Sequence, residues 1–240
     1  MPNYSNEIEV QAVKFRAEHH INNYEPINCN NLLLRLNVLT VYKNLSDDFS
    51  GMCLKQGDDK FILINSRHSV GRQHFTIAHE LYHLFIQKEF NLHFCNPGTL
   101  TKDLIEKKAD CFASNLLMPE LGLKTNIPEN ELREKKISIS TILILERLFS
   151  VSHAALLIRL KDLKLLDKNQ YEEYSKKNIR STALMNGYDT SLYESGNEGL
   201  VIGDYGIKAK KCYDEEKISE GHYRELMSDI GIDLTDIEHV

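Results

Sequence analysis

Residues 75–86 form a strongly apolar segment. A stretch of five residues inside it contains two histidines and a glutamate. Helical periodicity places His79 and His83 on one face, where both rings can reach a single metal ion, with Glu80 about 100° further round. A helix that is apolar nearly all round is buried, and buried imidazoles and carboxylates need partners or a metal. The His-Glu-x-x-His spacing is typical of zinc proteases, in which the glutamate is the general base.

A third metal ligand is expected, because catalytic zinc normally takes three protein ligands and keeps one position open. The metzincin pattern is excluded, since it needs glycine at 86 and histidine at 89, where this chain has isoleucine and glutamate. Glu106 lies on the next expected helix and is the preferred third ligand. Asp110, four residues further on, would accept a hydrogen bond from a ligating imidazole and fix its tautomer.

Several alternatives stay open at this stage. His93 and Asp103 are rival third ligands near the Asn96-Pro97-Gly98 loop. Without a metal, the two histidines would be hydrogen-bonded core residues, and Glu106 would belong to a charged surface run. A purely structural zinc would favour four ligands and cysteine, and no cysteine here has helpful spacing. The residue that stabilises the oxyanion is open among Arg72, His74, Tyr82 and His93.

The elements that must position these residues follow from apolar periodicity and turn signals. Strand-like runs at 38–42, 51–54 and 60–64, separated by Ser-Asp-Asp and Gly-Asp-Asp turns, predict a small antiparallel sheet. Helices are predicted at 6–20, 28–36, 71–89, 102–117, 139–148, 153–160, 168–182 and 219–230. The fold class is therefore α+β, with the sheet packed on a zincin-type helical core.

Three regions are predicted along the chain. Residues 1–137 form the zincin-like metallopeptidase domain, and residues 138–165 form a helix-turn-helix-like pair. Residues 166–240 form a small accessory region, rich in glycine around 200–208, whose role the sequence does not assign.

Composition narrows the function classes. The net charge of −6 lacks the basic surplus typical of nucleic-acid-binding proteins. Five scattered cysteines without a Cys-x-x-Cys pair predict free thiols in a reducing compartment. No charged leader with an apolar run is visible at the N-terminus, and no run approaches 18 apolar residues. We therefore expect a cytoplasmic protein with no membrane contact.

Two sequence blocks carry a family resemblance. Arg72-x-x-Phe-Thr-Ile-Ala-His79-Glu80-Leu-x-His83-Leu is the first, and Glu106-x-x-Ala-Asp110-x-Phe-Ala-x-x-Leu-Leu-Met-Pro119 is the second. Together they resemble the ImmA/IrrE family of metallo-endopeptidases, over roughly residues 8–165.

The resemblance implies a gluzincin-like zinc site of His79, His83 and Glu106, with Glu80 as the base. It also implies helix-turn-helix repressors or antitoxins as substrates, cut to control mobile elements, toxin–antitoxin loci or stress responses. Two departures are visible: Tyr82 stands where many members have glycine, and Asp110 replaces the more usual asparagine. Neither departure removes a ligand.

A non-catalytic regulator is the competing hypothesis, with residues 138–165 binding a repressor or DNA. The second helix of that pair offers only Arg159 and Lys161 as basic contacts. A helix that reads phosphates and bases usually has more. The sequence therefore favours packing against the protease core, or substrate docking, over DNA binding.

Overall fold

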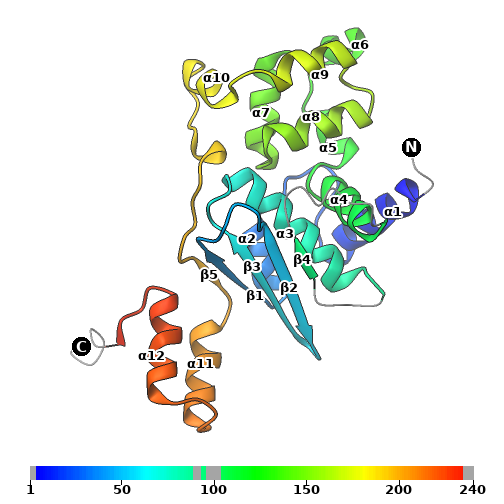
Figure 1. The fold of residues 1–240 in the computed structure, drawn as a ribbon. Helices are drawn as coiled ribbons and strands as arrows, with labels where there is room; N and C mark the ends of the chain where they lie inside the picture. The colour runs from blue at the N-terminus through cyan, green and yellow to red at the C-terminus, as the bar shows by residue number, and fades with distance from the viewer. Residues whose placement is uncertain (1–3, 89–92, 96–103, 235–240) are drawn as a thin grey trace.

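A mixed five-stranded sheet is the platform of the protein (Figure 1). The computed structural model describes residues 4–88, 93–95 and 104–234, with only the backbone described at 93–95. The strands lie in the order β4-β2-β3-β1-β5. Their bounds are Val38–Lys43 (β1), Gly51–Gln56 (β2), Asp59–Asn65 (β3), His93–Cys95 (β4) and Val201–Ile202 (β5).

The predicted strands are present, but the expectation of a wholly antiparallel sheet is wrong. β2 and β3 form an antiparallel hairpin through Gly57, whose φ of 60° glycine adopts readily. β1 instead pairs with β3 in parallel, from Val38 opposite Lys60 to Lys43 opposite Asn65. Residues 44–50 connect β1 to β2, which are not neighbours in the sheet, because β3 lies between them. Apolar alternation marks the strands but does not encode that direction.

Helices α2 and α3 pack against the sheet, and most helices begin near their predicted positions (Figure 1). The predicted helix at 168–182 is two helices, because Asn178 accepts a hydrogen bond from Ser181 N and caps the second. Helix α11 occupies part of the glycine-rich stretch around residues 200–208. The bounds are Ser5–Glu18 (α1), Cys29–Arg35 (α2), Val70–Phe85 (α3), Leu104–Leu117 (α4), Glu120–Thr125 (α5), Glu129–Glu134 (α6), Ile139–Phe149 (α7), His153–Asp162 (α8), Lys168–Ser175 (α9), Ile179–Met185 (α10), Ser191–Tyr193 (η1, a 3-10 turn), Tyr205–Asp214 (α11) and Glu220–Asp229 (α12).

Helix α3 is the central helix, packed between β2 and β3 on one side and α4 on the other. Ala109 and Ala113 of α4 are fully buried, and their small side chains permit the close approach of the two helices. Helix α1 packs on α4, and its buried Arg16 donates to the carbonyls of Leu116, Asn22 and Glu25. Burial lowers the pKa of Arg16 to about 10, yet its carbonyl partners keep the cation hydrogen-bonded.

Helices α7 and α8 meet at 108° across the turn at Ser150, which lies in the left-handed region (φ 52°). Within the described residues no single helix is long and apolar enough to cross a membrane. Helices α7 and α8 taken together have the length and apolar composition of a membrane span, but they are bent by 108°. Their turn lies directly on the first turn of α3: His74 Nδ1 lies 2.8 Å from Ser150 O. Burial lowers the pKa of His74.

Residues beyond 165 return to the sheet and to α3. β5 pairs with the edge of β1, and Val70 N donates to Glu194 O at 2.9 Å. Gln73 donates from Nε2 to Gly196 O, and its Oε1 accepts from Asn197 Nδ2 at 2.8 Å. The predicted domain boundaries after residues 137 and 165 stay predictions. The hydrogen bonds from residues 194–202 to β1 and α3 cross the boundary after residue 165.

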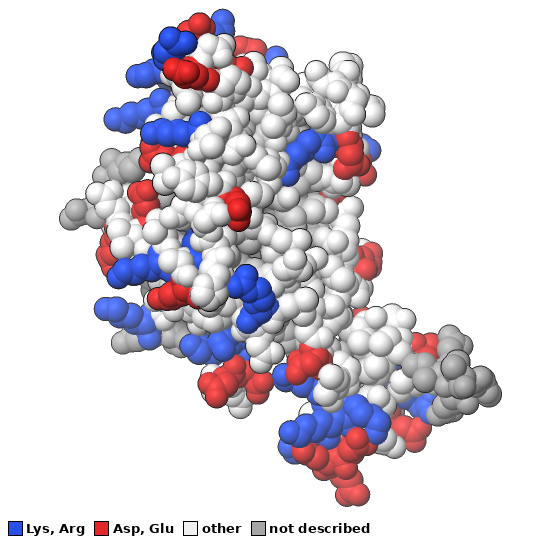
Figure 2. All heavy atoms as spheres, turned by 180° about the vertical axis from the view of Figure 1, so that it is seen from behind, with Lys and Arg blue, Asp and Glu red and all other residues white. Residues whose placement is uncertain are grey.

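Helices α11 and α12 pack on each other as a hairpin, with the rings of Tyr213 and Tyr223 stacked 5.1 Å apart. Figure 2 shows the hairpin as a charged lobe set off from the body of the protein. An ion pair of 2.8 Å between Lys43 and Asp229 joins this lobe to the sheet.

A buried polar cluster ties α7, α8, α9 and η1 together. Glu146 is fully buried, accepts from Tyr193 OH at 2.6 Å and lies 2.5 Å from His153 Nδ1. The other ring nitrogen of His153 faces Tyr174 O at 3.0 Å. The doubly protonated imidazole can donate to both of these oxygen acceptors, so this environment favours the cationic form of His153. Burial alone would lower the pKa of His153, but the hydrogen bond and charge of Glu146 outweigh it and raise the pKa.

His153 therefore makes stability dependent on pH. Because its folded-state pKa is raised, its contribution is complete below the ordinary value of 6.5 and is lost as pH rises through the folded value. We expect the difference in unfolding free energy between wild type and His153→Gln to be largest below pH 6.5. The difference should shrink as the pH rises through the folded-state pKa of His153. Urea denaturation across a pH series checks this, and a difference independent of pH would contradict it.

Gly71 marks a close approach of two backbones. A Cβ there would lie 2.7 Å from Ser152 N and 2.8 Å from Val151 C. We expect Gly71→Ala to lower the unfolding free energy by about 1–3 kcal/mol, as overpacking does. Gly221→Ala is the matched control, because this exposed glycine of α12 has only Ser219 Oγ nearby, at 4.0 Å. It should be stabilising by roughly 0.5–1 kcal/mol. Urea denaturation measures the change in unfolding free energy of each variant relative to wild type. Changes of the same sign in the two variants would contradict the proposed clash.

Candidate metal centre

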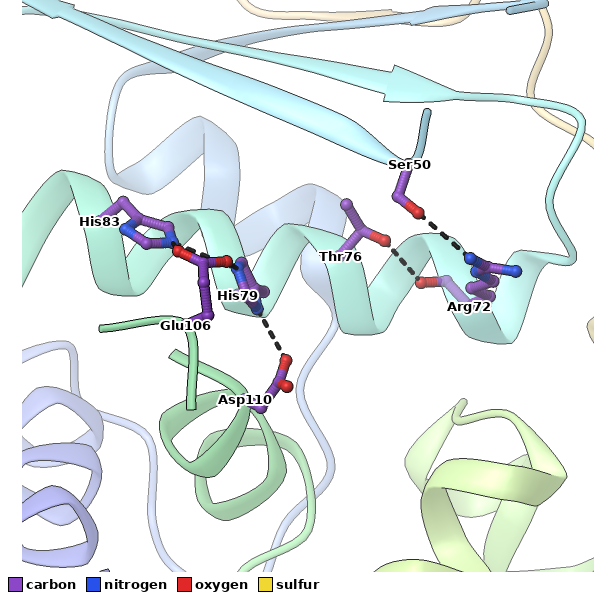
Figure 3. Close-up of polar contacts among 7 residues, drawn as sticks. All are labelled: Ser50, Arg72, Thr76, His79, His83, Glu106 and Asp110. Atoms are coloured by element: carbon purple, nitrogen blue, oxygen red, sulfur yellow. Dashed lines mark hydrogen bonds and ion pairs between the residues drawn. The ribbon is translucent and has the colours of Figure 1, made fainter. Parts of the chain in front are cut away.

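The His-Glu-x-x-His residues lie in the buried middle and C-terminal part of α3. His79 is 4% exposed, His83 1% and Glu80 0%. The helix continues past them because this stretch has neither glycine nor proline, and its apolar residues enter the core. Periodicity alone predicted that the two imidazoles share a face, and Figure 3 shows them side by side.

Glu106 completes a group of three candidate ligands. Helix α4 brings its carboxylate over the two rings, with Oε2 3.2 Å from His79 Nε2 and Oε1 3.6 Å from His83 Nε2 (Figure 3). The two Nε2 atoms are 3.1 Å apart. One ligand atom from each residue lies within 4.8 Å of the others, so the group can hold a metal ion. Glu106, which the sequence favoured as the third ligand, is the residue that completes this group.

The outer nitrogen of each imidazole faces an oxygen. His79 Nδ1 lies 2.9 Å from Oδ1 of Asp110, the residue that the sequence suggested as its acceptor (Figure 3). His83 Nδ1 lies 2.6 Å from Gln87 Oε1. In neutral rings these contacts place the protons on Nδ1 and leave the Nε2 lone pairs directed at each other and at Glu106. Two lone pairs and a carboxylate that converge repel one another unless a cation lies between them, so this donor set fits a metal ion.

Gln87 is a site residue that the sequence did not predict. A signal was present, since Gln87 follows His83 by four residues, the spacing at which helical side chains meet. A neutral amide carries no charge or metal-ligating group that would mark it in the sequence.

The remaining candidates have varied surroundings. Arg72 is exposed and donates to Ser50 Oγ at 3.2 Å, while its carbonyl accepts from Thr76 Oγ1 at 3.1 Å (Figure 3). His74 is bound to the α7–α8 turn, as described above. His93 lies in β4, outside the described side chains, and Asp103 lies outside the described residues. Neither rival ligand is therefore tested.

Tyr82, the glycine replacement, is 6% exposed and packs edge-on to the His83 ring at 5.6 Å and against Phe112 of α4 at 5.8 Å. Burial raises the pKa of its hydroxyl. The tyrosine at this position thus packs against a neighbouring helix. Four cysteines in the described part of the chain are free thiols, as expected: Cys29, Cys53, Cys111 and Cys212.

Comparison with known proteins decides the family. The sequence model of the IrrE N-terminal-like domain matches residues 34–161, just over half of the chain. The chain belongs to this family of metallopeptidases. The match spans every residue of the candidate metal centre together with helices α7 and nearly all of α8, and it ends before β5 and the α11–α12 hairpin.

Two curated relatives agree with this assignment. An uncharacterized immunity region protein 2 of Bacillus phage phi105 is 28% identical over 109 residues, which are 45% of this chain and 69% of the phage protein. Metallopeptidase ImmA of Bacillus subtilis (strain 168) is 36% identical over 67 residues, 28% of this chain and 40% of ImmA. The resemblance found in the two sequence blocks is thereby confirmed.

The metal centre makes a direct prediction. Purified protein should hold about one zinc per chain, the stoichiometry of a single three-ligand site. Alanine at His79, His83 or Glu106 should remove most of it, and elemental analysis after desalting measures this. His222→Ala is the matched control, because that histidine is exposed and lies on α12. Full zinc retention in all three ligand variants would contradict the assignment.

Proposed function

We propose that this protein is a zinc-dependent endopeptidase that cleaves a helix-turn-helix repressor or antitoxin partner and thereby controls gene expression. The observation that carries the proposal is the convergence of the Nε2 atoms of His79 and His83 with the carboxylate of Glu106, within 4.8 Å. This group lies inside the region that matches the metallopeptidase family.

Zinc suits this donor set, because two imidazole nitrogens and one carboxylate are the protein ligands of many catalytic zinc sites with one open position. His79, His83 and Glu106 would hold the ion. Bound there, zinc supplies Lewis acidity, which lowers the pKa of water and polarises a carbonyl group. Asp110 holds the His79 imidazole in the tautomer that presents Nε2 to the ion.

Glu80 is assigned the proton transfers. It follows His79 directly on α3 and is fully buried, so it flanks the ligand face in an apolar environment. Its carboxylate takes the proton from the attacking water as the new carbon–oxygen bond forms at the scissile carbonyl. It then gives that proton to the departing amine as the carbon–nitrogen bond breaks.

A repressor or antitoxin substrate is the finer part of the proposal. It is supported by the family and by the phage relative, whose name places it in an immunity region. We also propose a cytoplasmic location, where such a substrate and free thiols are both found.

The contacts of α8 weigh against the alternative of DNA binding. Arg159, one of its two basic candidates, is 6% exposed and donates to Met118 O and Asn115 Oδ1. Lys161, the other, lies over the Tyr171 ring at 4.4 Å. Arg159 is therefore committed to contacts inside the protein, which leaves the exposed Lys161 as the one accessible cation of these two, and α8 acts mainly as a packing helix. Strongly salt-dependent binding to duplex DNA would revive the alternative.

The role of Glu80 is tested by Glu80→Gln, which keeps the size of the side chain and removes its basicity. We expect zinc content to stay at the wild-type level while cleavage of a co-expressed repressor or antitoxin slows by at least about a hundredfold. Glu198→Gln, an exposed change of the same kind, should leave both unchanged. Cleavage is measured by the rate of product formation on gels, and wild-type rates in Glu80→Gln would refute the assignment.

A further inference from the structure

We infer that Gln87 is a positioning residue for the metal ligand His83, an inference that rests on the proposed function. Gln87 lies outside both ligand motifs, and its contact is short: Oε1 is 2.6 Å from His83 Nδ1. Gln87 would thus strengthen metal binding by orienting His83, without touching the metal itself.

The direction of the hydrogen bond follows from the other side of the ring. His83 Nε2 faces His79 Nε2 at 3.1 Å and Glu106 Oε1 at 3.6 Å, so it is the nitrogen that would bind the ion. A ligating nitrogen carries no proton, so the ring proton sits on Nδ1 and is donated outward. The amide oxygen of Gln87 is the acceptor that this proton requires.

The backbone fixes Gln87 in reach of His83. Helix α3 ends at Phe85, and the amides of Ile86 and Gln87 both donate to Tyr82 O at 2.9 Å. This shared carbonyl holds the last turn closed beside the His83 ring. Gln87 is itself partly buried, whereas Lys88, the next residue, is exposed. The end of the helix thus fixes the residue that supports the ligand.

The two imidazoles are supported unequally. His79 donates to a carboxylate, Asp110, whereas His83 donates to a neutral amide. A neutral acceptor fixes the tautomer and ring orientation as a carboxylate does, but adds no negative charge to the centre. Removing the acceptor should therefore weaken the metal site, and a carboxylate in its place should support it.

The test compares Gln87→Ala, Gln87→Met and Gln87→Glu in the full chain. Zinc affinity is measured by competition with a chromogenic chelator, and the site is also read by the visible absorption of the Co²⁺-loaded protein. We expect zinc to bind about 10–100-fold more weakly in the alanine and methionine variants, with an altered Co²⁺ spectrum, as loss of such a partner typically does. Gln87→Glu should bind zinc at least as tightly as wild type.

Lys88→Ala is the matched control and should change neither reading. The methionine variant keeps the length of the side chain, and urea denaturation of the metal-free forms separates a folding defect from a weakened site. Wild-type affinity in both the alanine and methionine variants overturns the inference, as does Gln87→Glu binding as weakly as they do. Absence of zinc binding by the wild type would instead overturn the proposed function.

Discussion

The structure depends on one constraint: helix α3 places two imidazoles and a carboxylate inside an apolar core. A buried polar group without a hydrogen bond costs about 1–3 kcal/mol, and a charge costs more. Neighbouring elements meet that cost around the rings. Asp110 and Gln87 accept the outer protons of the rings, and a cation held together with Glu106 would satisfy their inner nitrogens. The same arrangement that satisfies the core leaves lone pairs converging on one point, which is the property a metal site needs.

The surrounding elements fix α3 at three places along its length. At its start, Gly71 lets the α7–α8 turn approach, and Gln73 is held by residues of the C-terminal segment. In the middle, Ala109 and Ala113 let α4 lie close enough for Glu106 to reach the rings. At its end, Gln87 closes the last turn. A helix held in this way presents its candidate ligands rigidly, as a preformed metal site would require.

Much of the candidate centre could be predicted from the sequence, because it depends on spacing within helices. His79 and His83 share a face by periodicity alone, and Glu106 and Asp110 share another for the same reason. Sheet direction was not predictable, since the pattern of β1 is the same whether β3 runs parallel or antiparallel to it. Gln87 was missed because a neutral amide resembles any surface residue until a ring nitrogen is seen to face it.

Buried cations were equally hidden in the sequence. Arg159 was considered as a basic contact for DNA, but in the structure it joins α8 to the end of α4 through Met118 and Asn115. Arg16 does the same for α1 through Leu116. Both depend on carbonyl groups that are distant in sequence, and no local pattern identifies such partners. Charge counting on a helix therefore overestimates the surface available to a nucleic acid.

The C-terminal segment shows that the family match and the structural unit differ in extent. The match ends at residue 161, yet β5 covers the edge of β1, and Asn197 holds the Gln73 amide at the start of the ligand helix. Tyr193, also in this segment, donates a hydrogen bond to the buried Glu146 of α7. The chain beyond residue 165 is thus bound both to the sheet and to the helical pair. Any movement of this segment would act on α3 directly, because the two share hydrogen bonds.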